Sequence, residues 1–461
     1  MTLQSITPTR TLRRGRIAAM AAPAPEPAAD VRADWPDAVE LTSDSDNVSG
    51  YGSLVRQVRR SLTTNDVAVT EHKSRTALDG YEERERAPVL VDTKNGPRWA
   101  FEDQVDYVRE HGFYAEGMVP PKFGTKARRW ILGHPIRTYA NTLRLTEPAT
   151  RDAVRLNVGL PESCEYAGAN RRVLLTMWES TEIPTTFRPW APHIRRANLI
   201  IVPAKHSRRV ILDQVPEARV RVVPLALDAA DWPVIERGDR PADRPFVFLT
   251  VGDLSLRKGP ILLYQAFRKA FGDRSDVLLV FKSRGSSEFT DLDFMPNVRG
   301  EQWNRQPVRY HLVSRDANVR VLRGDWTRAG LRELYGHADC FVWPSLGEGW
   351  GYPPREAAAT GLPVITCAHT GMTDASDWAR VIPHKVDAVR AIFRHWGGEC
   401  GFFPKPDVDA LASALTWMVE HPHEARDLGA RGARVVTART SKHLGADILD
   451  EIAQIPVGGG R

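Results

Sequence analysis

Short apolar runs alternate with amphipathic stretches along much of this chain. The runs Val173–Trp178 and Leu199–Val202 have the length of buried strands, whereas residues 53–62 place apolar side chains at helical spacing. The same rhythm resumes with a strand at Phe246–Val251 and a helix at Ile261–Phe271. Strands that alternate with helices in this way predict an α/β fold with parallel sheets.

The other expected elements continue this alternation. In the first half, we expect strands at Ala38–Thr42, Val67–Thr70, Val89–Asp92 and Val220–Val223, and helices at Trp190–Arg196 and Arg208–Leu212. In the second half, we expect strands at Val277–Phe281, Val319–Leu322 and Cys340–Trp343, and helices at Arg328–His337, Arg355–Thr360, Leu411–Val436 and His443–Ile455. The pattern is weakest over Phe113–Arg144, which is rich in aromatic and basic residues.

A loop over residues 228–245, which contains glycine and several prolines, divides the chain into two α/β halves. Residues 284–317 are expected to form a long polar insertion in the second half. Two such halves would hold a ligand in a central cleft, which the carboxyl ends of both sheets face. We therefore predict a disordered basic, Pro/Ala-rich arm (1–35), an N-terminal Rossmann-like domain (36–240), a C-terminal Rossmann-like domain (241–425) and terminal helices that pack back toward the first domain (426–461).

Composition narrows the class of protein only moderately. The 461 residues carry a net charge of +6 and are 42% hydrophobic, as in an ordinary globular protein. No apolar run approaches the roughly 20 residues that a membrane span requires, although peripheral contact with a membrane is compatible with the charge. The four cysteines are scattered without paired spacing, which argues against disulfides and structural zinc and favours a cytoplasmic location.

The segment from Pro344 to Pro363 carries the strongest chemical signal. Three glycines, Gly347, Gly349 and Gly351, would let the backbone approach a ligand closely. Two prolines that follow them suit the first turn of a helix, and the free N–H groups of that turn suit a diphosphate. The segment therefore predicts a phosphate-binding turn between a strand and a helix.

Glu348 and Glu356 are separated by seven residues, so that one lies in the glycine loop and the other on the helix. This spacing resembles the E-x7-E motif of the retaining GT-B glycosyltransferases of family four. The resemblance implies the GT-B fold, with Glu356 on the ribose of a sugar nucleotide, Glu348 beside the donor sugar, and Gly349, Trp350 and Gly351 lining the donor site. The alternative is that Glu356 only complements a helix dipole and that Glu348 is a solvated loop residue.

A second segment places Arg257 and Lys258 between a strand and a helix. Two cations beside a departing nucleoside diphosphate would stabilise its negative charge without a metal ion. With Gly252 before them, they resemble the phosphate clamp of the same family. Asp253 occupies the place of the family's arginine, and Arg257 is our candidate for the missing charge. The alternative is a pair of surface cations at a helix start.

The N-terminal half offers two weaker candidates. Gly50 and Gly52 resemble the family's glycine loop near the donor phosphates, but Val55 stands where a dinucleotide fingerprint needs a third glycine. Glu179 follows a predicted strand that ends at Trp178, and we expect it to orient the acceptor or the donor sugar. A structural ion pair with Arg171, Arg188 or Arg195 is at least as good an interpretation of Glu179.

Other positions remain minor candidates. Lys282 follows a strand and could reach a phosphate, and Arg323 lies where family members often contact the base. We do not interpret His421 and His423, which flank a proline, as metal ligands, and we predict no metal site.

Together these signals predict a cytoplasmic enzyme that transfers a sugar from a nucleotide diphosphate sugar, its co-substrate, to an acceptor hydroxyl, with retention of configuration and without a cofactor. The first domain would take the acceptor and the second the donor. A glycan, a lipid-linked sugar or a small molecule is the favoured acceptor, and a modified base in DNA is a less favoured one. A non-catalytic sugar-nucleotide-binding protein on the same fold is the first alternative, and an NAD-type oxidoreductase is the second.

Overall fold

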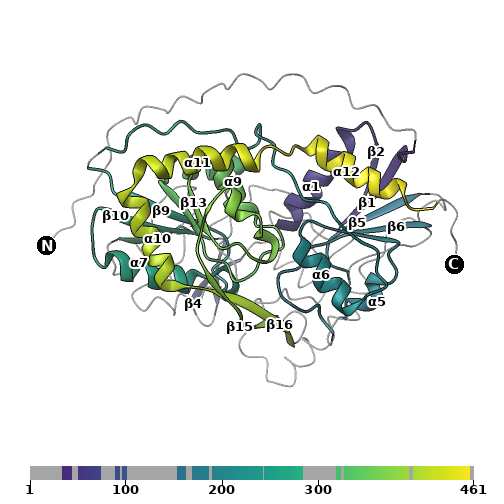
Figure 1. Ribbon diagram of the computed structural model, residues 1–461, viewed down its shortest axis with the longest axis horizontal. Coiled ribbons are helices and arrows are strands. Elements are labelled where there is room, and N and C mark those ends of the chain that lie inside the picture. Colours follow the sequence, from purple (N-terminus) through teal and green to yellow (C-terminus); the bar gives the residue numbers. More distant parts are fainter. Residues whose placement is uncertain are drawn as a thin grey trace.

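The computed structural model describes residues 34–43, 50–73, 89–93, 96–100, 153–161, 169–185, 189–241, 243–283, 318–322, 326–393 and 398–456. These residues form two α/β domains, each built on a six-stranded sheet (Figure 1). No helix within these ranges is long and apolar enough to cross a membrane.

The N-terminal sheet is parallel throughout, in the order β2-β1-β5-β6-β7-β8. Its central strands β5 and β7 are buried over their whole length, as expected of a parallel sheet covered on both faces. The strands are β1 (Ala38–Ser43), β2 (Ala68–Lys73), β5 (Val154–Val158), β6 (Arg171–Leu175), β7 (Leu199–Val202) and β8 (Val220–Val222), and the helices are α1 (Gly50–Thr63), α5 (Ala191–Ile194) and α6 (Lys205–Gln214).

The C-terminal sheet is also parallel, in the order β11-β10-β9-β12-β13-β14. Its strands are β9 (Phe246–Val251), β10 (Val277–Lys282), β11 (Val319–Leu322), β12 (Cys340–Trp343), β13 (Val364–Thr366) and β14 (Arg380–Val381). Its helices are α7 (Pro260–Phe271), α8 (Arg328–His337), α9 (Tyr352–Ala359), α10 (Val408–Glu420) and α11 (Pro422–Val436). The strand order reverses between β9 and β12, so the loops after these strands flank a topological switch point, where α/β proteins bind ligands.

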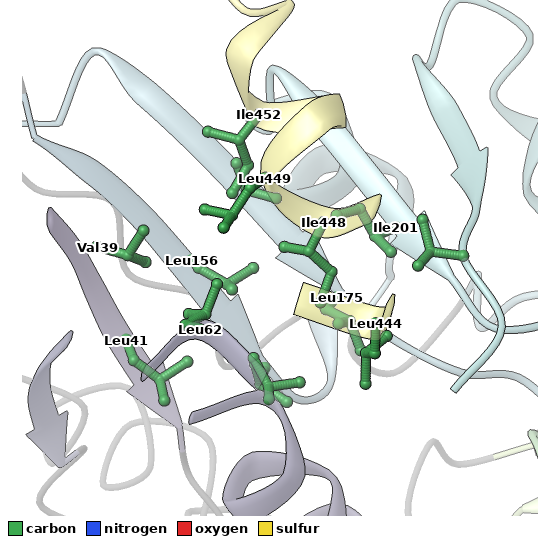
Figure 2. Close-up of a cluster of buried hydrophobic side chains, with 14 of the residues drawn as sticks. Val39, Leu41, Leu62, Leu156, Leu175, Ile201, Leu444, Ile448, Leu449 and Ile452 are labelled. Carbon is green, nitrogen blue, oxygen red and sulfur yellow. The ribbon is translucent and has the colours of Figure 1, made fainter. Parts of the chain in front are cut away.

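The last helix, α12 (Ser441–Ala453), leaves the C-terminal half and covers the N-terminal sheet. Figure 2 shows Leu444, Ile448 and Ile452 of this helix directed at the buried side chains of that sheet, such as Leu156. A Cβ at Gly445 would lie 2.1 Å from a backbone oxygen of α1, so a glycine is needed where the two helices touch. In contrast, α11 packs on α9 of the C-terminal domain.

Two parallel Rossmann-like domains are therefore confirmed, but several predicted elements were wrong in detail. The strand predicted at Val89–Asp92 is not part of the parallel sheet, because β3 (Val89–Thr93) forms an antiparallel hairpin with β4 (Gly96–Ala100). The helix predicted at Leu411–Val436 is two helices, since the chain turns at His421 and restarts at Pro422, which has no N–H to continue the first helix.

Six described strands were not predicted: β4, β5, β13, β14 and the antiparallel pair β15 (His384–Phe393) and β16 (Gly398–Pro406). The strand predicted at Val173–Trp178 is also shorter, because β6 ends at Leu175. Beyond it, the N–H of Trp178 donates to the Ser207 hydroxyl at 3.3 Å instead of to a neighbouring strand.

Candidate active site

Glu348 lies in the loop after β12, and its side chain is buried by its own hydrogen-bond partners. Lys258 Nζ lies 2.7 Å from Oε1 and 2.9 Å from Oε2 of this carboxylate. Oε1 also accepts hydrogen bonds from the Ser345 hydroxyl at 2.7 Å and from the Trp343 indole N–H at 3.1 Å. The alternative of a solvated loop residue does not fit, because only 5% of Glu348 is exposed.

The two loops that carry this ion pair are joined by their backbones. The 3-10 turn Leu256–Lys258 follows β9, and the carbonyl of Arg257 accepts a hydrogen bond from the N–H of Leu346 at 2.7 Å, with the Ser345 hydroxyl oxygen 3.1 Å away. Gly259 adopts φ +72°, and a Cβ there would lie 2.1 Å from the carbonyl oxygen of Pro344. Only glycine fits this close approach, which holds Lys258 against the loop after β12.

Arg257 links the two domains. Its Nη1 donates to the carbonyl of Gly347 at 2.5 Å and lies 3.8 Å from Glu348 Oε1. Its Nη2 lies 3.5 Å from Oε1 of Glu179, which comes from the loop after β6 in the N-terminal domain. The structure therefore brings together Arg257, Lys258, Glu348 and Glu179, two cations and two carboxylates from both domains.

The ionisation of these groups follows from their burial and mutual contacts. Burial and the neighbouring Arg257 lower the pKa of Lys258. Burial alone would raise the pKa of Glu348, but Lys258 and Arg257 outweigh it and lower that pKa. Burial would likewise lower the pKa of Arg257, but Glu179 and Glu348 raise it. Glu348 and Arg257 therefore stay charged.

The loop that carries Glu348 is hydrogen-bonded to Thr370, a residue with a strained backbone. The N–H of Glu348 donates to the Thr370 hydroxyl at 3.0 Å, and the carbonyl of Glu348 accepts from the N–H of Gly371 at 2.8 Å. Thr370 has φ +49°, a backbone conformation that β-branched residues seldom adopt. Strain of this kind persists only where surrounding contacts enforce it. Here it places the Thr370 hydroxyl against the loop of residues 344–351, which we call the motif loop.

Arg355, inside the same motif, was not predicted as a functional residue. Its guanidinium is buried and donates to both carboxylate oxygens of Asp374 at 2.7 Å. It also lies over the rings of Trp350 at 3.8 Å and Trp378 at 5.1 Å. Arg355 therefore fixes the shape of the loop. Trp350, a predicted donor contact, is 9% exposed beneath it.

The predicted glycines pack against the protein itself. A Cβ at Gly347 would lie 2.7 Å from the carbonyl oxygen of Glu179, and one at Gly349 would lie 2.6 Å from Cβ of Met177. Gly351 adopts φ +81° and touches Met372. The contacts of Gly347 and Gly349 bring the motif loop against the N-terminal domain, and all three contacts give the glycines a structural reason beside the predicted approach of a ligand.

Other predicted glycines occupy different settings. A Cβ at Gly252 would lie 2.5 Å from the Trp343 ring, so this glycine allows the loop after β9 to cover the indole. Gly50 and Gly52 do not lie in a turn, because α1 already begins at Gly50. Between them, the Tyr51 hydroxyl reaches the backbone of Met177, at 3.3 Å from its carbonyl oxygen.

Glu356 lies apart from the ion-pair cluster, in the second turn of α9 beside Tyr335 and Arg328 of α8. Burial raises the pKa of Glu356 to about 7, and Arg328 and Tyr335 only partly offset that rise. Lys282 is buried at the end of β10, with Nζ 5.1 Å from the centre of the Trp326 ring. The predicted Arg323 lies outside the described residues.

Comparison with known proteins shows which family one segment of the chain resembles. Residues 235–377 match the family Glycosyl transferases group 1. This group 1 segment contains Lys258, Glu348 and Glu356. A glycogen synthase from Mycobacterium tuberculosis (strain ATCC 25618 / H37Rv) is 28% identical over 218 residues, which are 47% of this chain and 44% of that protein. The chain therefore spans less than half the length of this curated relative.

Solved structures share the fold over most of the chain. A sucrose-phosphate synthase from Thermosynechococcus elongatus superposes with a TM-score of 0.56 at 14% identity, over 91% of this chain and 99% of the other. A UDP-forming trehalose-phosphate synthase from Burkholderia xenovorans, in complex with glucose-6-phosphate, superposes with a TM-score of 0.57 at 14% identity, over 90% of this chain and all of the other (100%). The predicted GT-B fold is confirmed by these neighbours.

The hairpin β15–β16, which follows the group 1 segment, connects the candidate site with the N-terminal domain (Figure 1). The N–H of Phe402 donates to the Thr181 hydroxyl at 2.8 Å, and the N–H of Thr181 donates to the Phe402 carbonyl at 3.3 Å. Phe393 lies against Trp178, with ring centres 4.9 Å apart. Phe403 packs where a Cβ of Gly347 would otherwise sit. The hairpin thus supports the loops of both Glu179 and Glu348.

Phe403→Ala should destabilise the protein by about 3–5 kcal/mol, because its buried ring fills the space between the hairpin and the motif loop. Phe402→Ala is a matched control, since its side chain is 37% exposed and only its backbone contacts Thr181. It should cost less than about 1 kcal/mol. Urea unfolding of both variants would measure the difference, and equal losses would show that the packing of Phe403 is unimportant.

Proposed function

We propose that this protein is a retaining glycosyltransferase that moves a sugar from a nucleotide diphosphate sugar to an acceptor hydroxyl. The observation that carries the proposal is the pairing of Lys258 and Arg257 with Glu348 at the switch point of the C-terminal sheet, facing Glu179 of the other domain. Two cations that converge beside a glycine loop provide the charge that a departing diphosphate requires. The E-x7-E spacing supports the retaining outcome.

The chemistry then needs positioning and charge stabilisation more than a nucleophile. The bond between the anomeric carbon and the diphosphate oxygen breaks, and its electron pair stays on the diphosphate. The acceptor oxygen bonds to the same face of that carbon, and its proton passes to the departing diphosphate oxygen. Lys258 and Arg257 would bind this oxygen and the negative charge on it, so that no metal ion is required. Glu348 would hold the donor sugar through its hydroxyls.

The nucleoside end of the donor would lie along α9, where Glu356 accepts hydrogen bonds from the ribose hydroxyls. A structural neighbour described as trehalose-6-phosphate from E. coli bound with UDP-2-fluoro glucose superposes with a TM-score of 0.55 at 13% identity, over 90% of this chain and 99% of that one. This supports including UDP-glucose among the donors to be tested. Lys282, whose Nζ lies over the Trp326 ring, would be a further cation for the donor phosphates.

Nucleotide binding should depend on pH through Glu356. Its pKa is raised to about 7, so its carboxylate is mostly protonated at pH 6 and mostly ionised at pH 8. Since the ionised form accepts hydrogen bonds more strongly, the affinity for UDP, GDP or ADP should rise about five- to tenfold between these pH values. Glu356→Gln should remove this rise, while the phosphate of the nucleotide titrates identically in both proteins. Calorimetric titration at both pH values tests this, and parallel profiles would exclude the role.

A donor panel tests the proposed function as a whole. The protein should release nucleotide from at least one common UDP-, GDP- or ADP-sugar, and the rate should be unchanged by EDTA. Binding without turnover across a wide range of acceptors would favour the non-catalytic alternative. A panel with neither binding nor turnover would exclude the proposal, and binding of NAD would favour the oxidoreductase.

The acceptor is the open half of the reaction. A glycan, a lipid-linked sugar or a small hydroxyl compound is the favoured class, and a modified base in DNA is the less favoured one.

The three described cysteines, Cys340, Cys367 and Cys400, are free and buried, which is compatible with the proposed cytoplasmic location.

A further inference from the structure

Arg257 has two alternative anionic partners in the proposed reaction, the carboxylate of Glu179 and the diphosphate of the donor. In the structure it spans the two domains, with Nη1 on the Gly347 carbonyl and Nη2 directed at the carboxylate of Glu179, 3.5 Å away. Both side chains of the Arg257–Glu179 pair are 23% exposed. A long, partly solvated ion pair of this kind stabilises little, so another anion can displace one partner at low cost.

Glu179 is nevertheless held in a fixed place. On one side, its neighbour Ser180 offers its carbonyl to the buried His206 ring, 3.0 Å away. On the other side, the Trp178 indole N–H donates to the carbonyl of Glu182 at 2.7 Å, which closes the turn around Glu179. The hairpin β15–β16 contacts the neighbouring Thr181, whose hydroxyl accepts a hydrogen bond from the N–H of Phe402. The carboxylate of Glu179 is therefore presented at the domain boundary by a rigid turn.

We propose that Glu179 is an exchangeable partner of Arg257 that couples donor binding to acceptor binding. Without a donor, Glu179 neutralises Arg257. When the diphosphate of a donor binds, Arg257 turns to its oxygens, because a diphosphate offers more negative charge and bidentate acceptors. The carboxylate of Glu179 is then released beside the donor and accepts a hydrogen bond from an acceptor hydroxyl next to the one that reacts, whose own proton passes to the diphosphate.

This exchange has two consequences. Donor and acceptor binding reinforce each other, because an acceptor that engages Glu179 also leaves Arg257 free for the diphosphate, and such coupling is reciprocal. The reacting end of the acceptor carries a neutral hydroxyl, since an anionic group would lie against the released carboxylate. The inference deepens the proposed function and rests on it.

The distinguishing prediction is that Glu179→Gln binds nucleotide diphosphates more tightly but transfers sugar more slowly. Titration calorimetry with UDP, GDP and ADP should give an affinity about two- to fivefold higher than that of the unmodified protein, for whichever nucleotide binds. Glu182→Gln is the matched control, because it removes the same charge from an exposed side chain of the same turn and should leave the affinity unchanged. In an Arg257→Ala background, Glu179→Gln should no longer tighten binding.

The outcomes separate this inference from the proposed function. Tighter binding in Glu179→Gln alone, lost in the Arg257→Ala background, supports the exchange. Equal tightening in Glu182→Gln would show a general charge effect and would overturn it. Unchanged or weaker binding in Glu179→Gln would also overturn it, while leaving the glycosyltransferase proposal intact. If none of the nucleotides binds the unmodified protein, the proposed function fails as well.

Discussion

Replacing Lys258 by alanine should lower the rate of sugar transfer by about two to three orders of magnitude, the largest effect that we expect from a single substitution. The ammonium group contacts both carboxylate oxygens of Glu348, and in the proposed mechanism it binds the leaving diphosphate. Because charge builds up on the diphosphate only as the bond breaks, the loss should appear in kcat more than in donor binding. Steady-state kinetics with the best donor would measure it.

The same substitution also leaves Glu348 without its closest cation, so stability must be measured alongside activity. A Lys258→Met, Glu348→Gln double variant removes both charges and should keep the fold while remaining inactive. Lys269→Ala, an exposed lysine on α7 paired with Asp409, is the matched control and should retain full activity. If Lys258→Ala loses only stability and a stable double variant transfers sugar normally, the lysine is structural.

Glu348→Gln is expected to be nearly as damaging to transfer, with a loss of about two orders of magnitude. Its carboxylate is held by Lys258, Ser345 and Trp343, so the amide keeps much of the packing but loses the negative charge. Affinity for the nucleotide diphosphate without sugar should stay within about threefold, because the proposed role of Glu348 is toward the donor sugar.

Comparing the transfer rate with the affinity for the free nucleotide decides whether Glu348 contacts the sugar or supports the loop. If the affinity for the free nucleotide falls as far as the transfer rate, Glu348 acts by holding the loop. Glu333→Gln on α8 removes an exposed carboxylate from the same domain and should change neither quantity.

The sequence predicted the sheets best where strands are buried on both faces. The predicted ranges Phe246–Val251 and Cys340–Trp343 coincide with β9 and β12. A short, continuous apolar run bounded by polar loops is typical of a strand in a parallel sheet that is buried on both faces. The hairpin β15–β16 was missed, since its strands mix charged and apolar residues with irregular pairing. No simple alternation marks it.

The candidate site was predictable as separate motifs but not as a cluster. Lys258 and Glu348 are 90 residues apart, and they meet because β9 and β12 are neighbours in the sheet, an order that periodicity alone does not reveal. The ion pair of Arg257 with Glu179 depends further on how two domains face each other. The predicted ion-pair partners of Glu179 were Arg171, Arg188 or Arg195, and Arg257, which the structure places 3.5 Å from it, was not among them.

The buried Arg355 shows a different limit. A charged residue within a helix is normally solvated, so nothing in the local pattern distinguishes it from its neighbours. Its burial is possible because Asp374, from the loop after β13, and two tryptophan rings satisfy it together. Such long-range compensation is invisible in a single sequence.

The most direct test of the central claim is a crystal structure with an unreactive analogue of the donor found by the panel. We predict that its diphosphate lies within hydrogen-bond distance of Lys258 and Arg257, and that its ribose hydroxyls donate to Glu356. The sugar should then lie beside Glu348, between the two domains. A nucleotide bound elsewhere, with Lys258 still paired only to Glu348, would contradict the account.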